Sequence, residues 1–507
     1  MNQMETNILA WLEKTADRLP QKVAYFSEQE SITFGETREK ARRIGSFLAA
    51  GALGENPVAV MLDKEVDTIP AFLGVVYSAR AYAPIDASLP DARIQAILST
   101  LNPSAVLTNA SNREKAARCL QTEAPILLLH DLLESREEPA CLDAARKRML
   151  ETDPLYIIFT SGSSGVPKGV VTSHHSLMCY IEDYAGMMDI QEADRLGNQS
   201  PLDYIAAIRD IYLPLYCGCS TCLIPKTAFM QADRLTEILN SQNITALGWS
   251  VSALTVLTAL GVPADYTPQT VRKICFSGSV MPGAVLHKWQ EYMPETRFVN
   301  QYGPTEATAS CTYYVVDHLV EENETLPIGV PYNHYRILLL SDDGEAVREG
   351  ECGEICVGGP CLALGYWGNP ERTRKDFILN PLNRLYDERI YRTGDIGRLR
   401  PDGNLEFHGR KDRQIKHMGH RVELDEIESA ALALPHVNAC CVVYDAEKEV
   451  LHLFYTGTAS ARELAVGLRL TLPGFMIPRK MHSLEEMPCL PNGKTDMGTL
   501  KSMMKTM

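Results

Sequence analysis

Two patterns of apolar and polar positions alternate through the first four hundred residues. In segments such as 34–48, apolar residues recur every three or four positions, which predicts amphipathic helices. Between the helical segments lie short apolar runs rich in β-branched residues, which are typical of buried strands. These runs are NPVAVMLD (56–63), SAVLTNA (104–110), APILLLH (124–130), LYIIFTSG (155–162) and ITALGWS (244–250). Strands and helices that alternate in this way predict an α/β fold whose parallel sheets are covered by helices.

The pattern changes near residue 400. After a tight turn at Asp402 and Gly403 we expect a short strand, a charged hairpin and a helix that begins near Glu423. A strand pair in 439–457 and a last helix from about Ala461 complete a small α+β unit. The chain is therefore expected to form two domains joined through the charged segment GRKDRQIK. They are a large N-terminal domain of parallel and mixed sheets flanked by helices, residues 1–410, and a small mobile α+β C-terminal domain, residues 411–507.

Length and charge limit the classes of function. A chain of 507 residues is too long for one compact core, which agrees with two or more domains. The formal net charge of −15 argues against a nucleic-acid partner, although a local site for an anionic substrate remains open. Charged residues interrupt the apolar N-terminal segment, so neither a signal peptide nor a membrane span is predicted. We expect a cytoplasmic protein with no membrane partner.

The fourteen cysteines predict reduced thiols rather than a disulfide framework. Cys217, Cys219 and Cys222 are close together in the sequence, but a metal site there would need a fourth ligand. Their glycine-containing segment is better explained as a turn between two buried elements.

The strongest chemical signal is YIIFTSGSSGVPKGV, residues 156–170. A buried strand runs directly into a loop of Ser, Thr and Gly, and Lys168 follows a proline. Glycines let successive backbone N–H groups converge on an anion, hydroxyls add donors, and the lysine supplies a positive charge. The spacing from Gly162 to Lys168 differs from that of the P-loop. A flexible Ser/Gly linker is the alternative, and the strand that leads into the loop argues against it.

Three further motifs are weaker when each is taken alone. In NQYGPTEAT (300–308), Glu306 is suited to hold a divalent cation, but the segment is also a plausible turn and helix start capped by Thr305. In YRTGD (391–395), the carboxylate of Asp395 is suited to two vicinal ribose hydroxyls, yet it also fits an ordinary loop. In LPNGKTD (490–496), Lys494 lies on a turn, where a lysine is usually a solvated surface charge.

The order and spacing of these motifs resemble the adenylate-forming superfamily over nearly the whole chain. Supporting segments are AYAPIDASLPDARI (81–94), GEICVGGPCLALGYWGNPE (353–371) and GRKDRQIKHMGHRVELDEIE (409–428). That superfamily includes acyl- and aryl-CoA synthetases, luciferases and the adenylation domains of non-ribosomal peptide synthetases. The last segment and PIDASLP look most like the peptide-synthetase branch and its relative, D-alanine–carrier-protein ligase.

The resemblance implies a ligase that works in two steps. A carboxylate attacks the α-phosphate of ATP–Mg²⁺ to give an acyl-adenylate and pyrophosphate. A thiol, typically the phosphopantetheine arm of a carrier protein, then displaces AMP to give a thioester. The implied catalytic residues are Thr160, Glu306 and Lys494, where Glu306 helps to hold Mg²⁺ and Lys494 bridges the carboxylate and the α-phosphate. Asp412 matches the hinge about which the small domain turns between the two steps.

The same resemblance implies an ATP site spread over several motifs. Residues 160–168 would wrap the β- and γ-phosphates, Tyr302 would stack near the adenine, Asp395 would bind the ribose, and Arg410 would reach the ribose and phosphates. The full implied set is Thr160, Ser161, Gly162, Ser163, Ser164, Gly165, Lys168, Gly278, Asn300, Tyr302, Gly303, Thr305, Asp395 and Arg410.

The segment SPLDYIAAIRDIYLPL, 200–215, is expected to be a helix that contacts the substrate. Amino-acid-activating members of the superfamily have an Asp, just after an aromatic residue, that pairs with the substrate's α-ammonium. An ungapped alignment puts Tyr204 at the aromatic position and Ile205 at the Asp position. A buried ammonium against Ile205 would be unpaired, so the substrate is expected to lack an α-ammonium group. A two-residue shift would instead make Asp203 the amine partner.

The remaining pocket positions are mostly small and leave room for a flat, wide substrate. By resemblance the pocket consists of Tyr204, Ile205, Ala206, Arg209, Gly248, Cys275, Ser277, Gln301, Ala309 and Ser310. An aromatic acid, such as anthranilate, a hydroxybenzoate or a hydroxylated aminobenzoate, fits best. The role of Arg209 stays open, since it could pair with Asp210 or Asp203 or meet a polar group of the substrate.

Other functions are weighed against this one. An amino-acid ligase for D-alanine or a β-amino acid is the alternative within the superfamily. A non-catalytic scaffold is the alternative of another class, and retention of Lys168, Glu306, Asp395 and Lys494 argues against it. No segment after Lys494 could carry phosphopantetheine, so we expect a free-standing enzyme of antibiotic or other natural-product biosynthesis that loads a separate carrier protein. KARR (40–43) and GRKDRQIKH (409–417) are candidate basic patches for that carrier.

Overall fold

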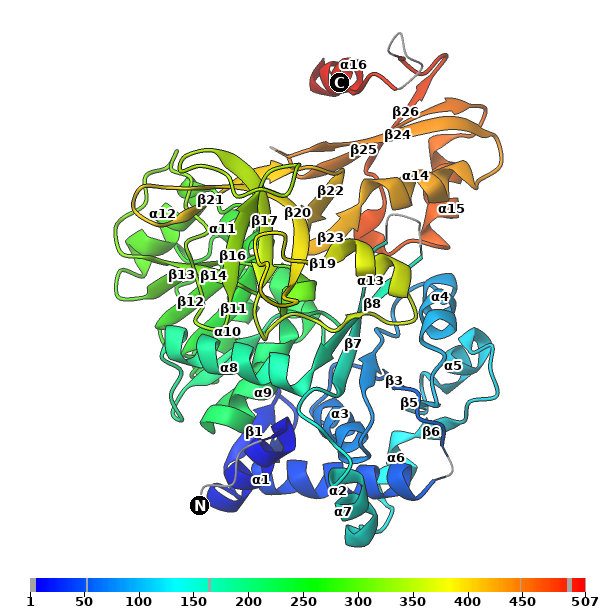
Figure 1. Ribbon diagram of the computed structural model, residues 1–507, viewed down its shortest axis with the longest axis vertical. Helices are drawn as coiled ribbons and strands as arrows, with labels where there is room; N and C mark the ends of the chain where they lie inside the picture. The colour runs from blue at the N-terminus through cyan, green and yellow to red at the C-terminus, as the bar shows by residue number, and fades with distance from the viewer. Residues whose placement is uncertain (1–5, 52, 163–165, 447, 490–494, 507) are drawn as a thin grey trace.

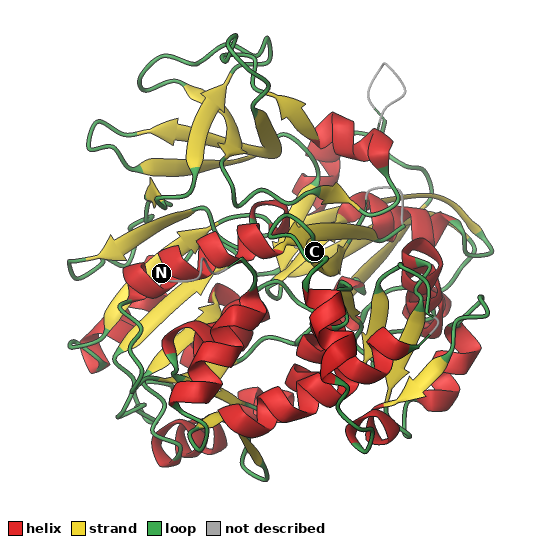
Figure 2. Ribbon diagram, turned by 60° about the horizontal axis from the view of Figure 1, so that its bottom comes forward, coloured by secondary structure: helices red, strands yellow, loops and turns green. Residues whose placement is uncertain are grey.

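A computed structural model describes residues 6–51, 53–162, 166–446, 448–489 and 495–506. Residues up to 410 form three sheets with helices packed against them, and the residues that follow form two small sheets and their helices (Figure 1). Helices lie against strands over most of the molecule (Figure 2). The predicted α/β fold, with a large N-terminal part and a small C-terminal part, is confirmed.

The largest sheet has nine strands and carries most of the predicted substrate positions. Its order is β15 (Val330–Pro331), β14 (Thr312–Val316), β13 (Arg297–Tyr302), β12 (Lys273–Ser277), β11 (Ala246–Ser250), β9 (Arg195–Asn198), β10 (Ser220–Leu223), β1 (Val23–Phe26) and β2 (Ser31–Thr33). The six strands from β13 to β1 run parallel to one another, whereas β14, β15 and β2 pair antiparallel with their neighbours. The carboxyl ends of β11, β12 and β13 therefore meet at one edge, where α/β sheets commonly bind ligands.

The second sheet has seven strands and carries the predicted phosphate loop. Its order is β18 (Gly365–Tyr366), β8 (Lys168–Ser173), β7 (Pro154–Thr160), β4 (Tyr82–Pro84), β3 (Val58–Met61), β5 (Ala105–Thr108) and β6 (Ile126–Leu128). The five strands from β7 to β6 run parallel, whereas β8 and β18 are antiparallel to their neighbours. Strands were predicted in all five of the apolar runs, and β3, β5, β6, β7 and β11 lie within them.

The helices of the N-terminal part follow or precede these strands along the chain. They are α1 (Ile8–Arg18), α2 (Phe34–Ala50), α3 (Thr68–Tyr77), α4 (Asp91–Leu101), α5 (Arg113–Cys119), α6 (Leu129–Leu133), α7 (Pro139–Arg146), α8 (His174–Met188), α9 (Ala207–Cys217), α10 (Ala232–Ser241), α11 (Val251–Ala259) and α12 (Gly283–Tyr292), with 3₁₀ turns η1 (Lys226–Met230) and η2 (Thr305–Ala307). Apolar residues of α1, α8 and α9 share one core with both large sheets.

Helix α2 shows how local sequence sets an element. Thr33 accepts a hydrogen bond from the backbone N–H of Glu36, and the Glu36 carboxylate accepts one from the backbone of Thr33, which is a capping box. The helix was predicted over 34–48 and extends to Ala50. It packs closely on α3, because a side chain at Gly45 or Gly74 would overlap the facing helix.

A third, antiparallel sheet is formed by residues that precede the C-terminal part in the chain. Its strands are β16 (Arg336–Leu340), β17 (Cys352–Gly358), β20 (Arg389–Leu399) and β19 (Phe377–Leu379), with β21 (Leu405–Arg410) paired to β20 and α13 (Pro370–Asp376) beside it. Strand β20 continues through the predicted ribose motif, so Asp395 lies on a strand rather than in a loop.

The C-terminal part has its own apolar cores. Its elements are β22 (Gln414–His417), β23 (His420–Glu423), α14 (Leu424–Leu432), β24 (Val437–Asp445), β25 (Val450–Gly457), α15 (Ala461–Arg469), η3 (Gly474–Met476), β26 (Lys480–Leu484) and α16 (Met497–Thr506). The predicted hairpin and strand pair are present, but the expectation that the helix near Ala461 is the last was wrong. Helix α16 follows it and packs Leu500 and Met504 against β24 and β25.

No strand pairing in the described ranges connects residues before 411 to residues after it. The domain boundary at residues 410 and 411 stays a prediction. Across the described part of the chain, no helix has both the length and the apolar content needed to cross a membrane. All fourteen cysteines are free, and no group of three or more metal-ligating side chains forms among the described residues, at Cys217, Cys219 and Cys222 or elsewhere.

Candidate active site

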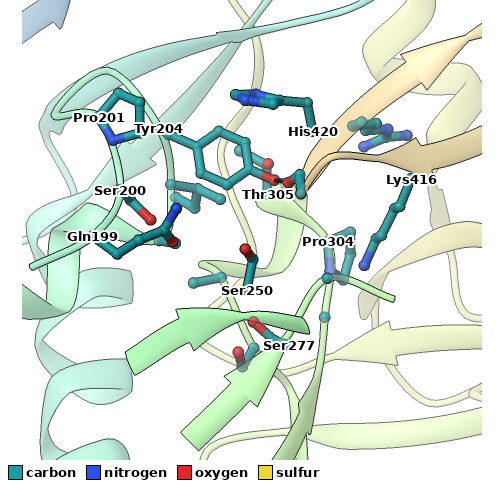
Figure 3. A pocket seen from close by; sticks show the side chains of 18 of the residues that line it. Gln199, Ser200, Pro201, Tyr204, Ser250, Ser277, Pro304, Thr305, Lys416 and His420 are labelled. Atoms are coloured by element: carbon teal, nitrogen blue, oxygen red, sulfur yellow. Dashed lines mark hydrogen bonds between the residues drawn. The ribbon is translucent and has the colours of Figure 1, made fainter. Parts of the chain in front are cut away.

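A cavity lies where the carboxyl ends of β11, β12 and β13 face the β22–β23 hairpin of the C-terminal part. Figure 3 shows Ser250 and Ser277 at two of these strand ends, with Tyr204 projecting from one side and Lys416 and His420 from the other. The cavity is therefore built by both parts of the chain. Tyr204 joins the two parts directly, because its hydroxyl donates to the backbone carbonyl of Gly419 at 2.6 Å.

Most of the predicted pocket residues line this cavity. They are Tyr204, Ile205, Ala206, Arg209, Ser277, Ala309 and Ser310, and from the predicted ATP set Gly278, Gly303 and Thr305 also line it. Three predicted pocket residues lie behind the surface instead. Gly248 and Gln301 contact the guanidinium of Arg209, and the sulfur of Cys275 lies 2.9 Å from the hydroxyl of Tyr184.

Residues 200–206 are not helical, contrary to the expectation for 200–215. Helix α9 begins at Ala207, and the preceding residues form turns in which Tyr204 bonds to the carbonyl of Pro201 and Ala207 to the carbonyl of Tyr204. The turns aim Ile205 at the cavity. Asp203 is not part of the cavity wall. Burial and the neighbouring Asp86 raise the pKa of Asp203 to about 7.

Arg209 is buried at the cavity wall, with 2% of its surface exposed. Its Nη2 donates to the carbonyl of Gly248 at 2.6 Å and its Nη1 donates to Oε1 of Gln301 at 3.3 Å. Neither expected carboxylate is an ion-pair partner. Asp210 accepts a hydrogen bond from Asn198 at 2.8 Å, and within the described ranges no carboxylate oxygen forms a salt bridge with Arg209.

The predicted phosphate loop connects β7 to β8, whose residues Thr160 and Lys168 face each other across the ladder. Both are buried, and neither the Thr160 hydroxyl nor the Lys168 ammonium has a hydrogen-bond partner among the described residues. A side chain at Gly162 would come within 2.1 Å of the carbonyl oxygen of Val166, so this position requires glycine. Ser163, Ser164 and Gly165 lie outside the described residues. A phosphate would supply the acceptors that these buried donors lack.

The charges beside the loop are strongly perturbed. Burial is the main cause that lowers the pKa of Lys168 to about 8, and the nearby Arg421 adds to it. Burial alone would raise the pKa of Glu306, but Arg421 and Lys168 outweigh it and lower that pKa to about 2. Glu306 is fully buried and ionised at neutral pH, and Tyr366 donates to it at 2.8 Å. One carboxylate of this kind, with substrate phosphates and water, is the usual donor set for Mg²⁺.

The predicted ribose carboxylate, Asp395, is buried, and each of its oxygens accepts a hydrogen bond. Tyr302 donates its hydroxyl to one carboxylate oxygen, and Arg410 donates to the other. Arg410 also bonds to the carbonyl of Thr393. The remaining residue of the predicted nucleotide set, Asn300, is buried and donates to the carbonyl of Pro327 at 2.9 Å. The ammonium of Lys416, which the sequence did not single out, lies 5.9 Å from the centre of the Tyr302 ring.

The predicted hinge residue Asp412 follows β21. Its carboxylate accepts hydrogen bonds from Arg410 at 2.7 and 2.9 Å and from the backbone N–H of Gln414. Lys494 lies outside the described residues. The elements before and after it, β26 and α16, lie on the outer side of the C-terminal part, away from the β22–β23 hairpin (Figure 1).

Three charged residues of the C-terminal part reach into the predicted phosphate and metal site. Arg421 donates to both oxygens of Glu306, at 2.8 and 2.6 Å. Glu423 lies 3.8 Å from the ammonium of Lys168, and Glu426 forms a buried ion pair with Arg93. Ser161 in the loop also bonds to the carbonyl of Arg421 at 2.8 Å. All three charges belong to the GRKDRQIKHMGHRVELDEIE segment, but their targets lie more than one hundred residues away in sequence.

The two candidate basic patches do not present unpaired charge. In KARR, Lys40 pairs with Asp67, Arg42 with Glu13 and Glu137, and Arg43 with Glu39. In 409–417, Arg410, Lys411 and Arg413 also pair with carboxylates, and Lys416 faces the cavity. Local acids therefore pair with most of the cations in both segments, and the role of these segments in carrier docking stays a prediction.

Comparison with known proteins places this site in a family. A family model described as AMP-binding enzyme matches residues 12–367. The chain is 29% identical over 490 residues to tyrocidine synthase 1 of Brevibacillus parabrevis, covering 96% of this chain but 44% of the synthase. It is 29% identical over 505 residues to zwittermicin A synthase ZmaJ of Bacillus cereus, covering 97% of this chain and 94% of ZmaJ.

A solved structure shares the fold. NpsA-ThdA, an artificially fused adenylation–PCP di-domain protein from Klebsiella oxytoca, superimposes with a TM-score of 0.82 at 20% identity, over 95% of this chain and 94% of that one. At this identity the likeness concerns the fold alone. The chain spans less than half the length of tyrocidine synthase 1, so that relative has further parts with no counterpart here.

Proposed function

This chain belongs to the AMP-binding enzyme family, and from that premise we propose that it activates a carboxylic acid with ATP. The product would be an acyl-adenylate, formed with release of pyrophosphate. A thiol would then take the acyl group and release AMP. The observation that carries the proposal is the pair of buried donors at the ends of the phosphate loop, Thr160 and Lys168, neither of which has a hydrogen-bond partner among the described residues. A scaffold protein would have no reason to keep these donors buried without hydrogen bonds.

In the first step, the loop between β7 and β8 would hold the β- and γ-phosphates through backbone N–H groups, Thr160 and Lys168. Asp395 would accept the ribose hydroxyls, with Tyr302 and Arg410 fixing its position. Mg²⁺ would be held by Glu306 and would neutralise phosphate charge. Lys494, which the family resemblance assigns to the reacting carboxylate and α-phosphate, would stabilise the charge that builds up between them.

The arrangement of the C-terminal part suits the second step. Arg421 is bound to Glu306, so the positive charge that Mg²⁺ would supply comes from the protein itself. Glu423 and Glu426 place carboxylates beside Lys168 and Arg93. Under the proposed function, these three side chains carry charges of the same signs as Mg²⁺ and pyrophosphate, beside the residues that would bind them. We therefore assign this arrangement to the state after pyrophosphate has left, in which a thiol would approach the adenylate.

The substrate proposal rests on Ile205. This residue lines the cavity, whereas Asp203, the other candidate for an amine partner, does not. Small residues, among them Ala206, Ala309 and Gly303, form much of the remaining wall. Such a wall accepts the face of a planar ring and offers no carboxylate to an α-ammonium. An aromatic acid related to benzoate, including anthranilate and hydroxybenzoates, is therefore favoured over an α-amino acid.

The acceptor is proposed to be the phosphopantetheine arm of a separate carrier protein. Support comes from the relatives, since the Klebsiella oxytoca structure fuses an adenylation domain to a PCP domain and the curated relatives are peptide and zwittermicin synthases. A D-alanine or β-amino-acid ligase that uses Asp203 is the competing function. Asp203 would have to reach the cavity for that function, from its place beside Asp86.

The test is ATP–pyrophosphate exchange across benzoates, aminobenzoates, hydroxybenzoates, D-alanine, and α- and β-amino acids. We expect exchange with aromatic acids and a loss of at least tenfold with α-amino acids. Transfer is then measured as acylation of carrier proteins by mass spectrometry. Exchange with amino acids alone would replace the aromatic proposal by the amine-recognising one, and exchange with no acid would refute the activity.

A further inference from the structure

The base of the cavity has a buried positive charge, Arg209, that forms no salt bridge with a carboxylate of the described residues. Arg209 stays protonated at any physiological pH, and its Nε has no hydrogen-bond partner among the described residues. Buried arginines are normally paired with an acid, because an isolated buried charge is strongly unfavourable. Arg209 instead has two neutral acceptors, the Gly248 carbonyl and the Gln301 amide oxygen.

The surrounding titratable groups do not supply the missing negative charge. Burial raises the pKa of Tyr180, Tyr184 and Cys275, so all three are neutral at pH 7. Asp210 interacts electrostatically with Arg209, but it interacts with Lys64 as well. Arg209, Lys64 and Asp210 together carry two positive charges and one negative charge, so one positive charge is unmatched at the cavity wall.

The guanidinium is held in a fixed place. An added side chain at Gly248 would lie 2.5 Å from Nε of Arg209, so the absence of a Cβ at this position makes room for the guanidinium. Gln301 is fixed in turn, because its Nε2 donates to the hydroxyl of Tyr332 at 2.8 Å. The centre of the guanidinium also lies 5.7 Å from the middle of the Tyr184 ring. A preorganised cation of this kind is suited to bind an anion without rearrangement.

We propose that the acid activated by this enzyme carries a second carboxylate, which binds Arg209 at the base of the cavity. The inference rests on the proposed function and narrows its substrate to an aromatic dicarboxylic acid. The reacting carboxylate would lie at the nucleotide end, near the phosphate loop, and the second carboxylate at the opposite end would accept from the guanidinium of Arg209. The apolar side chain of Ile205 and the small wall residues would contact the ring between the two ends.

The experiment compares acids that differ only in the charge of the second group. Pyrophosphate exchange is measured with benzoate, with isophthalate and terephthalate, and with the carboxamides that replace one carboxylate of each diacid. We expect one diacid to exceed its carboxamide in kcat/KM by on the order of 10²- to 10³-fold, as for a buried charge that loses its partner. Calorimetric titration of the enzyme with the same two compounds, without ATP, should show the same preference.

Two variants connect the preference to Arg209. Arg209→Gln should remove the difference between the diacid and its carboxamide, while circular dichroism and thermal unfolding report that the variant still folds. Gly248→Ala, which displaces the guanidinium without removing its charge, should weaken diacid binding less than Arg209→Gln. A mild effect of Gly248→Ala on benzoate itself would show that the rest of the cavity is intact.

Some results would overturn the inference and leave the proposed function standing. These are equal exchange with diacid and carboxamide, or a diacid preference that survives in Arg209→Gln. Exchange that needs an α-amino diacid would refute the assignment of Ile205 but support the role of Arg209. Absence of exchange with every acid would refute the proposed function itself, and the inference with it.

Discussion

Replacing Arg421 by Ala should separate the two half-reactions. Arg421 donates to both oxygens of Glu306, a carboxylate with none of its surface exposed, while 15% of the arginine side chain is exposed. Breaking a buried ion pair costs about 3–5 kcal/mol, because the remaining charge is left unpaired. Tyr366 and Lys168 stay near Glu306 and offset part of this, so about 2–3 kcal/mol is a reasonable magnitude.

That free energy applies to the arrangement in which the hairpin contacts the site. A loss of 2–3 kcal/mol corresponds to a fall of roughly 30- to 150-fold in the population of this arrangement. Under the proposed function, pyrophosphate exchange does not require the arrangement in which the hairpin contacts the site, so the exchange rate should change by less than about tenfold. Thioester formation from pre-made adenylate should fall by the full factor, measured in single turnover with the carrier or with a pantetheine thiol.

The matched control is Arg413→Ala. Arg413 lies in the same segment but pairs with Asp425 and Glu428 inside the C-terminal part, so both half-reactions should keep similar rates. Arg421→Lys keeps the charge and should recover part of the loss. Equal losses of exchange and transfer in Arg421→Ala would refute the reasoning, because Arg421 would then act in the first step.

Four further outcomes are expected. Lys168→Met should abolish exchange yet raise the free energy of unfolding at pH 7 by about 3 kcal/mol, because burial lowers the pKa of the ammonium from 10.5 to about 8. In urea unfolding, this gain in stability should shrink as the pH rises from 8 to 10.5. Ile205→Asp should lower exchange with an aromatic acid by roughly 10²-fold, whereas Asp203→Asn changes it little. Gly162→Ala should lower exchange at least tenfold, since the new methyl group would meet a carbonyl oxygen at 2.1 Å. Lys494→Ala should slow adenylate formation by about 10²- to 10³-fold and affect thioester formation far less.

Each of these has an outcome that contradicts it. A fall in the unfolding free energy of Lys168→Met would mean that the contacts of the ammonium with Glu423 and the Tyr366 ring outweigh the cost of its burial. Loss of activity in Asp203→Asn with Ile205→Asp tolerated would reverse the assignment of the amine position. Normal exchange in Gly162→Ala would show that the loop shifts at little cost, and equal loss of both steps in Lys494→Ala would give that lysine another role.

Local signals were sufficient for many elements. The capping box of Thr33 and Glu36 starts α2 at the predicted residue, and the apolar runs contain β3, β5, β6, β7 and β11. Strand order was not predictable in the same way, because β1 lies beside β10 and the order in a sheet depends on packing between distant segments. Helix α16 was missed for a related reason: its residues Leu500 and Met504 are fixed by contacts with β24 and β25.

In the candidate site, too, local motifs were informative whereas contacts between distant segments were not predictable. The motifs placed Lys168, Glu306 and Asp395 in one region, but the pairing of Glu306 with Arg421 spans 115 residues and leaves no local pattern. The role of Arg209 was left open between an ion pair with Asp210 or Asp203 and contact with a polar group of the substrate. Residues at i and i+1 of a helix point in different directions, so Asp210 turns to Asn198 while Arg209 turns to the cavity.

The charges that Arg421, Glu423 and Glu426 bring to the phosphate loop have a consequence for the cell. Under the proposed function, pyrophosphate and the C-terminal part compete for Lys168 and Glu306. Pyrophosphate in solution would then slow carrier loading by occupying a surface, in addition to reversing the first step by mass action. The slowing of carrier loading would level off once the pyrophosphate concentration exceeds the dissociation constant of pyrophosphate from the loop. A pyrophosphatase in the same compartment would therefore set the pace of the second step as well as the direction of the first.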